Sequence, residues 1–305
     1  MAGTLALPFL IASAVVTGFA YGPANPASSH LLVKVTPNKL RGRIFSIKQT
    51  SVPIGGAVAG FALPFLTIQI GWQMASLAVA GACISLALAL QPLRQQMDAD
   101  RISASPLLGG RLMAALGLVL RHPTLRHLAA ASGAFAAMQF CFMSVFVAFA
   151  VERTGFSLVA VGTALSTGLV VSVFSRMGWG WAADRFPPRY VLAALGLSMS
   201  ISAFLAAMLA PNWPYVALVA LAIAFGSTGT AWQGVYLAEV ARNAPEGQVA
   251  DATSGCMAVT FFGALVGPGM FSTLDSLTGN DAAGFVLVGV ITFAFGVAFL
   301  FRKHA

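Results

Sequence analysis

The sequence predicts an all-α fold, a polytopic bundle of transmembrane helices, and two observations predict it. Of 305 residues, 58% are hydrophobic and only 9% are charged, whereas soluble domains carry about 25% charged residues. The apolar residues also come in blocks of roughly 20, which is the number needed to cross a hydrocarbon core of about 30 Å as a helix. These blocks do not alternate in polarity as the strands of a membrane barrel would. We therefore expect the lipid bilayer to be the main partner of the chain.

Nine spans are predicted when the apolar blocks are divided at their Pro, Gly and polar breakers. They cover residues 5–35, 44–67, 72–91, 128–151, 158–181, 190–210, 214–240, 249–273 and 283–301. A longer polar stretch, 92–127, separates the third span from the fourth. This predicts a partial N-terminal transmembrane bundle over 1–91, a cytoplasmic central loop over 92–127 and a C-terminal six-helix bundle over 128–305.

The basic residues predict the orientation in the membrane. The net charge of +8 is not gathered on one solvated face, as a nucleic-acid partner would require, because Lys and Arg fall between the apolar blocks. Lys and Arg are retained on the cytoplasmic side. If the C-terminus is inside, only Arg153 of the 17 Lys and Arg residues falls outside. We expect a multi-pass protein of the cell (inner) membrane with its N-terminus outside and its C-terminus cytoplasmic.

A weak internal repeat links the two halves of the chain. A shift of 208 positions places residues 21–60 on 229–268 and superimposes Lys34 on Arg242, Pro37 on Pro245, Ser46 on Ser254, Gly55 on Gly263 and Val58 on Val266. A parallel repeat of two bundles produces such a match. In this register the first span pairs with the fourth of the six later spans. The N-terminal bundle is thus expected to lack its first three helices.

Two motifs resemble the major facilitator superfamily of transporters. The first is Gly180-Trp-Ala-Ala-Asp184-Arg185-Phe-Pro-Pro-Arg189, which is similar to a loop signature of that family, with Pro187 where Gly is usual. The second is Tyr21-Gly-Pro-Ala-Asn25-Pro followed by Pro37-Asn-Lys-Leu-Arg41-Gly-Arg43, which resembles the exit of the fourth helix into the fifth. The subfamily stays open, with a cyanate-permease-like or similar prokaryotic branch as one resemblance. The resemblance implies two six-helix bundles that rock about a central site and move a small solute by alternating access.

The loop motif is expected to act as a cytoplasmic latch between the bundles. Its residues are Gly180, Asp184, Arg185 and Arg189. By resemblance, Asp184 should contact the start of the span after Arg41-Gly42-Arg43, where unpaired N–H groups and the helix dipole favour an anion. Arg242 is the expected second partner. The alternative is a plain positive-inside loop with a solvated carboxylate.

Polar side chains inside apolar spans are the candidate substrate contacts, because they are costly in lipid unless paired or hydrated. Gln139 and Gln233 are such residues, and Asn25 occupies the repeat-equivalent position of Gln233. Trp232 and Tyr236 could stack on a solute. We expect Gln139 and Gln233 to face one cavity. The alternative is that these amides bridge helices.

His30 is the only histidine within a predicted span, and its imidazole could take part in proton coupling. The alternative is a hydrogen bond between helices. No carboxylate and no arginine lies in the middle of a predicted span, so an anion-binding arginine would belong to the missing helices. The cysteines lack metal or redox spacing. No cofactor and no metal site are expected.

Two other classes of protein compete with the transporter. An intramembrane enzyme would need a zinc helix, paired acids or a Ser/His dyad, and the sequence supplies none of them, so we expect no enzyme activity. A non-transporting remnant or scaffold is the remaining alternative. The substrate, the coupling ion, and the choice among uniport, symport and antiport stay open. So does the oligomeric state, with a monomer as the simplest expectation.

Overall fold

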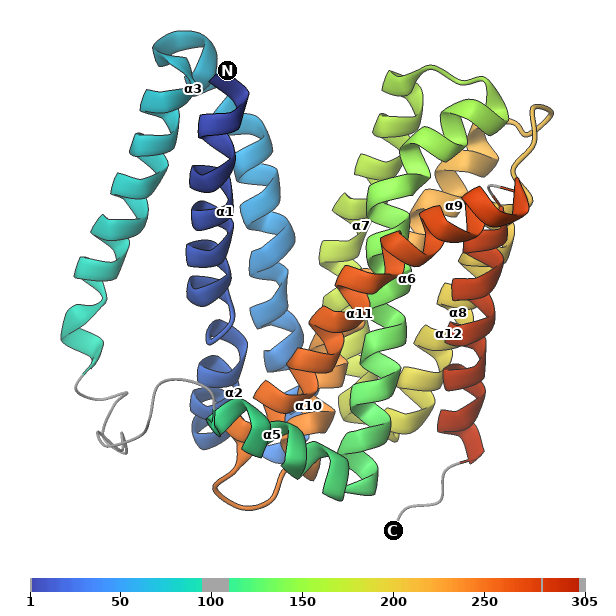
Figure 1. Ribbon diagram of the computed structural model, residues 1–305. Coiled ribbons are helices and arrows are strands. Elements are labelled where there is room, and N and C mark those ends of the chain that lie inside the picture. Colours follow the sequence, from blue (N-terminus) through green and yellow to red (C-terminus); the bar gives the residue numbers. More distant parts are fainter. Residues whose placement is uncertain (1, 95–109, 281, 302–305) are drawn as a thin grey trace. The chain divides into compact units, whose positions relative to one another are not determined.

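The computed structural model describes residues 2–94, 110–280 and 282–301, and all regular structure in these ranges is helical (Figure 1). The chain divides into two compact units, Met1–Gln49 with Leu108–Ala305, called unit 1, and Thr50–Leu107, called unit 2. The helices are α1 (Ala2–Tyr21), α2 (Ala24–Val35), η1 (Asn38–Leu40), α3 (Arg41–Ala89), η2 (Gln91–Leu93), α5 (Gly110–Arg121), α6 (Pro123–Thr154), α7 (Leu158–Arg185), α8 (Pro188–Ala207), α9 (Tyr215–Thr228), α10 (Gln233–Asn243), α11 (Val249–Thr278) and α12 (Ala283–Phe301).

Unit 2 holds most of α3. Gly71 has a φ of 80°, which breaks this helix into two and which only glycine adopts without strain. The segment after the break is apolar and largely exposed, with Trp72 66% and Leu88 66% exposed. Exposed apolar surface of this extent is typical of a helix that contacts lipid.

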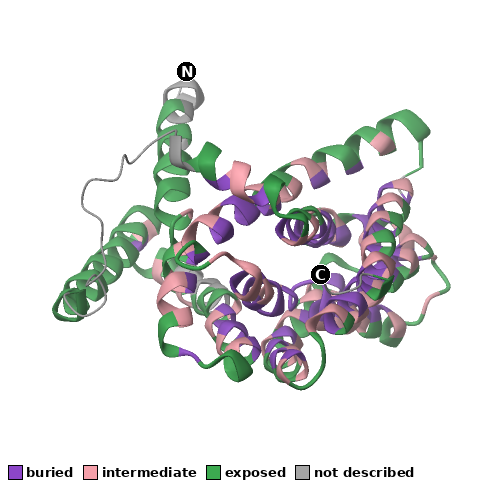
Figure 2. Ribbon diagram, turned by 90° about the horizontal axis from the view of Figure 1, so that it is seen from below, coloured by how far each residue is buried: buried purple, intermediate pink, exposed green. Residues whose placement is uncertain are grey.

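Unit 1 is a bundle whose long helices meet at small residues. The α6 and α11 helices pack together, as do α8 with α12 and α7 with α9. A Cβ atom on Gly263 of α11 would lie 2.0 Å from the carbonyl oxygen of Gly133 on α6, and one on Gly226 of α9 would lie 2.0 Å from that of Gly168 on α7. Buried residues gather where these helices face one another (Figure 2). Glycine therefore sets the closest approach of the backbones, as it does in membrane bundles.

Seven described helices are long and apolar enough to cross a membrane, not the nine predicted. They cover Phe65–Leu93, Pro123–Thr154, Leu158–Arg185, Pro188–Ala207, Tyr215–Asn243, Val249–Thr278 and Ala283–Phe301. The predicted span 5–35 is divided at Gly22-Pro23 into α1 and a short, polar α2. The predicted span 44–67 falls on the first half of α3, where several side chains lie outside the described residues.

The segment predicted as a central loop contains a helix. The α5 helix spans Gly110–Arg121, buries Ala115 and Val119, and packs against α11 at Gly255. Its hydrophobic residues follow helical spacing on one side, and this side packs against the bundle. The segment is therefore not an irregular loop over these residues. Residues 95–109 lie outside the described part of the chain.

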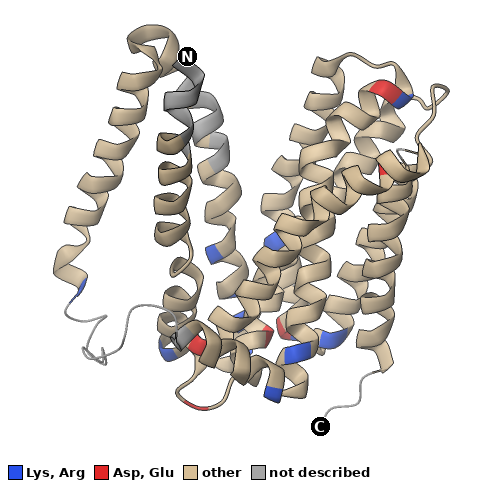
Figure 3. Cartoon of the chain, in the orientation of Figure 1, with Lys and Arg blue, Asp and Glu red and all other residues tan. Residues whose placement is uncertain are grey.

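Charged residues of unit 1 gather towards one end of its helices (Figure 3). The α6 helix carries a charge at each of its ends. Arg126 lies in its first turn and Arg153 in its last. At about 1.5 Å per residue the two are roughly 40 Å apart along the helix. The distance suits a helix that crosses a bilayer with both charges at its surfaces.

The helix boundaries repeat with the register of the sequence repeat. Arg41 and Val249, which begin α3 and α11, are 208 residues apart, and so are Val35 and Asn243, which end α2 and α10. Gly71 and Gly279 are also 208 apart, and both have positive φ, 80° and 60°. The repeat therefore extends beyond the five matched residues to the backbone itself.

Candidate functional site

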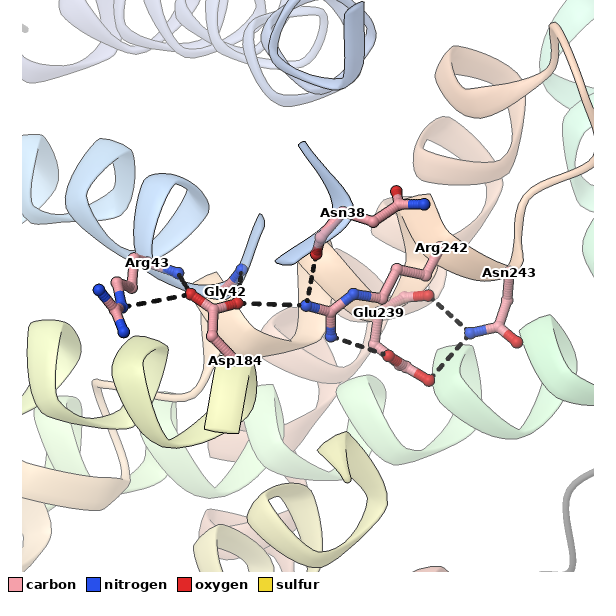
Figure 4. A network of polar contacts seen from close by, with 7 residues as sticks. All are labelled: Asn38, Gly42, Arg43, Asp184, Glu239, Arg242 and Asn243. Atoms are coloured by element: carbon pink, nitrogen blue, oxygen red, sulfur yellow. Dashed lines mark hydrogen bonds and ion pairs between the residues drawn. The ribbon is translucent and has the colours of Figure 1, made fainter. Parts of the chain in front are cut away.

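The side chain of Asp184 connects the end of α7 to the first turn of α3 (Figure 4). Its Oδ1 accepts a hydrogen bond from the backbone N–H of Gly42 at 2.7 Å, and its Oδ2 accepts one from that of Arg43 at 3.0 Å. These are two of the N–H groups that a helix start leaves without partners. The carboxylate is only 3% exposed, so it is held against the positive end of the α3 dipole with little access for water.

Arg242 extends this contact to α10. Its Nη2 lies 3.2 Å from Asp184 Oδ1 and donates to the carbonyl oxygen of Asn38 at 3.3 Å, while its Nη1 lies 3.5 Å from Glu239. Asn243 donates to the Glu239 carboxylate at 3.0 Å. We call the contact of Asp184 with Gly42, Arg43 and Arg242 the Asp184 clamp. It joins α7, the start of α3 and the end of α10.

Small residues let the three backbones of the clamp approach. A Cβ atom on Gly42 would lie 2.6 Å from both Asp184 Oδ1 and the carbonyl oxygen of Gly180. A Cβ atom on Gly180 would lie 2.7 Å from the Gly42 carbonyl oxygen, and one on Gly234 would lie 2.4 Å from the Cα of Ser46. The clamp therefore requires glycine at 42 and 180 as much as it requires the acid.

The other basic residues predicted for the latch lie around the clamp. Arg43 makes an ion pair of 3.5 Å with Asp184 but is 45% exposed, and such exposed pairs contribute little. Arg185 is exposed, while Arg189 donates to the hydroxyl of its neighbour Tyr190 and stacks on that ring. Burial, followed by the charge of Arg242, lowers the pKa of the Arg41 guanidinium. The clamp is thus centred on Asp184 and Arg242.

The amide of Gln139 lies in the interior of unit 1. Its Oε1 accepts a hydrogen bond of 3.0 Å from the indole N–H of Trp232, and both side chains are buried. Tyr236, also buried, packs its ring on Trp232 with 5.3 Å between centroids. Three of the predicted substrate contacts, Gln139, Trp232 and Tyr236, are therefore one connected group between α6 and α10.

Gln233 and Asn25 lie in a second polar group. Gln49 donates from its Nε2 to Gln233 Oε1 at 3.3 Å, and Lys48 donates to Asn25 Oδ1. His30 is half-buried on α2 and has interactions of its own. A pocket of about 540 Å³ at the start of α6, lined by Pro123, Arg126, His127, Ala130, Ala298 and Phe301, contains none of the predicted substrate contacts.

The structure also corrects the expectation that no arginine lies in the middle of a span. Arg176 is nine residues before the end of α7 and only 3% exposed, and its Nη1 donates to the carbonyl oxygen of Gln49 at 2.6 Å. The sequence placed Arg176 near the inner face because α7 was predicted to end at residue 181, whereas it continues to Arg185. The position of Arg176 within the apolar block 158–181 could have identified it as a candidate site residue.

Comparisons with known proteins agree with a bundle of membrane helices. The family model described as "Major Facilitator Superfamily" matches residues 1–243. The chain is 26% identical to a gallate transporter of Pseudomonas putida, covering 95% of this chain and 70% of that one. It is 29% identical to a probable nitrate/nitrite transporter of Mycobacterium tuberculosis, covering 77% of this chain and 58% of that one.

The crystal structures of the fucose:proton symporter of E. coli have the same fold. One matches with a TM-score of 0.68 and 16% identity over 92% of this chain and 73% of that one. A second, in the outward conformation, matches with a TM-score of 0.66 and 17% identity. The chain belongs to the Major Facilitator Superfamily. It is a multi-pass membrane protein whose relatives are transporters and not enzymes.

Proposed function

We propose that this chain moves a small solute across the cell membrane by alternating access, as part of a two-bundle transporter in which the Asp184 clamp closes the cytoplasmic side. The observation that carries the proposal is the clamp itself, a buried carboxylate that joins α7 to the start of α3 through backbone N–H groups. Such a contact can be made and broken as a unit when the bundles rock. Membership of the family supports the rest.

The organisation we propose is a partial N-terminal bundle (1–91), then the central segment 92–127 and a six-helix C-terminal bundle (128–305). The 208-residue match of the boundaries of α2 and α3 with those of α10 and α11 supports it, because equivalent helices of two bundles would begin and end in the same register. We place the N-terminus outside and the C-terminus in the cytoplasm.

The solute-contacting residues we propose are the two amide groups, Gln139 with Trp232 and Tyr236, and Gln233 with Asn25. Each brings hydrogen-bonding groups into an otherwise apolar interior. His30 is proposed as a proton-coupling residue. The relatives are named for gallate and for nitrate or nitrite, and the solved structure for fucose with a proton. What these solutes share is small size and several oxygen atoms, which suits amide and indole donors.

Uptake into proteoliposomes tests the proposal. The purified chain is reconstituted, and uptake of labelled gallate, nitrate and fucose is followed with and without a proton gradient. Liposomes that contain Gly180→Leu are the matched control, because a side chain at 180 would displace the backbone at Gly42 and open the clamp. Uptake above empty liposomes that Gly180→Leu slows supports alternating access. Equal uptake by empty and loaded liposomes for every solute contradicts it and favours the remnant or scaffold.

A further inference from the structure

Arg176 carries a positive charge inside unit 1 without an acidic partner among the residues that the structure describes. It lies on α7, about 13 Å along the helix axis from Arg185 at roughly 1.5 Å per residue, and it is 3% exposed. Its Nη1 donates to the carbonyl oxygen of Gln49, but its buried Nε has no hydrogen-bond partner among the described residues. No described carboxylate lies within ion-pair distance of it.

This arrangement is costly for a membrane protein unless a ligand completes it. Arginine keeps its proton in proteins, so it cannot become neutral to reduce the cost. Charged residues inside the membrane are rare, and they mark pathways for substrates and ions. A buried N–H donor with no acceptor adds to the cost. Both features indicate that an acceptor with negative charge binds at Arg176.

The residues around Arg176 supply a second positive charge and neutral amides. Gln49, whose carbonyl oxygen Arg176 contacts, donates from its side chain to Gln233 at 3.3 Å. Lys48, the preceding residue of α3, donates to Asn25. Two cations, three amides and no acid therefore make up this group, which we call the Arg176 cluster. Its members are Asn25, Lys48, Gln49, Arg176 and Gln233.

We propose that the Arg176 cluster binds a small planar oxyanion, a carboxylate or an inorganic anion of the nitrate type. The planar guanidinium presents two N–H groups in a fork that matches two oxygens of such an anion. Lys48 adds a point charge, and the amides of Gln49 and Gln233 donate to oxygens that the cations leave free. The proposal deepens the proposed function, on which it rests, by giving the solute a charge and a site.

Ligand-dependent thermal unfolding of the purified full chain in detergent tests the proposal. The probes are sodium benzoate, sodium nitrate and the neutral analogue benzamide, each compared with sodium chloride at equal ionic strength. A ligand that binds the folded state raises the unfolding temperature with its concentration. We expect benzoate, nitrate or both to raise it and benzamide not to. Benzoate alone would identify a carboxylate site and nitrate alone an inorganic one. A response to neither anion, or an equal response to benzamide, overturns the proposal.

Three variants locate the binding. Arg176→Gln should weaken binding of the active anion by about tenfold or more, because a charge-assisted pair is lost. Arg176→Lys should keep part of the affinity, since it keeps the charge without the fork. Lys48→Gln should also weaken binding, and it decides the matter if the Arg176 variants do not fold. Arg153→Gln, at the far end of α6 and stacked on Phe149, is the control and should bind normally.

Wild-type affinity in Arg176→Gln, or in Lys48→Gln where Arg176→Gln does not fold, overturns the proposal. The assay needs no solute flux. A chain that binds the anion but transports nothing therefore contradicts the proposed function and leaves the Arg176 cluster in place. A chain that transports a neutral solute and binds no anion supports the proposed function and overturns anion binding at the Arg176 cluster.

Discussion

Asp184 is the residue on which the proposed latch depends. Its carboxylate is almost fully buried and meets two backbone N–H groups and Arg242. Contacts of a charge with a helix start contribute about 0.3 to 1 kcal/mol each, and up to about 2 kcal/mol when partly buried. Several of them together can bias a conformational equilibrium without locking it, which is what a latch that must open requires.

We therefore predict that Asp184→Asn loosens the first turn of α3. The amide oxygen can still accept one N–H, but the charge is lost, at a cost of about 1 to 2 kcal/mol or roughly five- to thirtyfold in the closed population. Hydrogen exchange of the peptide that carries Gly42 and Arg43 should become faster, and uptake slower, with solute affinity unchanged. The control is Asp275→Asn, because Asp275 is exposed and lies near the C-terminal end of α11, which is not part of the clamp. Unchanged exchange and uptake would reduce the loop to a topology signal.

Gln139 can serve as a substrate contact or as a bridge between helices, and substitution separates the two roles. Gln139→Leu leaves the buried indole N–H of Trp232 without its acceptor, so we predict a loss of about 1 to 3 kcal/mol in unfolding free energy. The double variant with Trp232→Phe removes both partners and should recover most of that loss. Recovery of stability without recovery of solute affinity indicates substrate contact. Recovery of both indicates a helix bridge.

The long helices were predictable because apolar blocks of sufficient length allow few other structures in lipid. The breaks inside them were harder to predict. Gly22-Pro23 divides one predicted span into α1 and α2, and residues 229–232 separate α9 from α10 within another. Each break is followed by a more polar helix, α2 or α10, which was predicted as one span with the apolar block before it. Helix α5 was missed because its 12 residues are too short to span a bilayer.

At the level of helix packing, the contact of α6 with α11 provides a matched pair of glycines. Gly263 has no room for a Cβ, whereas nothing lies within 4 Å of a Cβ placed on Gly269 of the same helix. We predict that Gly263→Ala lowers the unfolding free energy by about 1 to 3 kcal/mol through overpacking. Gly269→Ala should be neutral or stabilising by up to about 1 kcal/mol. Thermal unfolding of both purified variants measures the difference, and equal midpoints would contradict close packing at Gly263.

The partners of Asp184 could be named from the sequence because its motifs resemble those of the superfamily, and that resemblance implies the contact with the helix start. The partner of Arg176 could not. Its contact with Gln49 joins residues 127 positions apart on α7 and α3, and periodicity alone does not say which side of α7 faces α3. The neutral amides were singled out for their polarity, but their pairing with Trp232 and Gln49 follows only from the packed bundle.

Over the whole molecule, the orientation follows from the charge distribution and remains a prediction. We expect a reporter that is active only in the cytoplasm to be active when fused after Ala305, because Lys and Arg gather at that end of unit 1. The same reporter inserted after Gly155, between α6 and α7, should be inactive. The reverse pattern would invert the topology. Activity at both sites would change the number of spans.

Positions 42 and 43 of the Asp184 clamp should tolerate substitution to different degrees. Asp184 binds the main-chain N–H groups at both positions, so neither side chain is needed for these two hydrogen bonds. Every amino acid except proline supplies the N–H at 43, and the Arg43 side chain is 45% exposed. Position 42 has no room beyond hydrogen. Selection for transport from a library randomised at both positions would then return glycine at 42 and a broad range of residues at 43. We therefore expect relatives of this chain to keep glycine at position 42 and to vary in the charge of the residue at position 43.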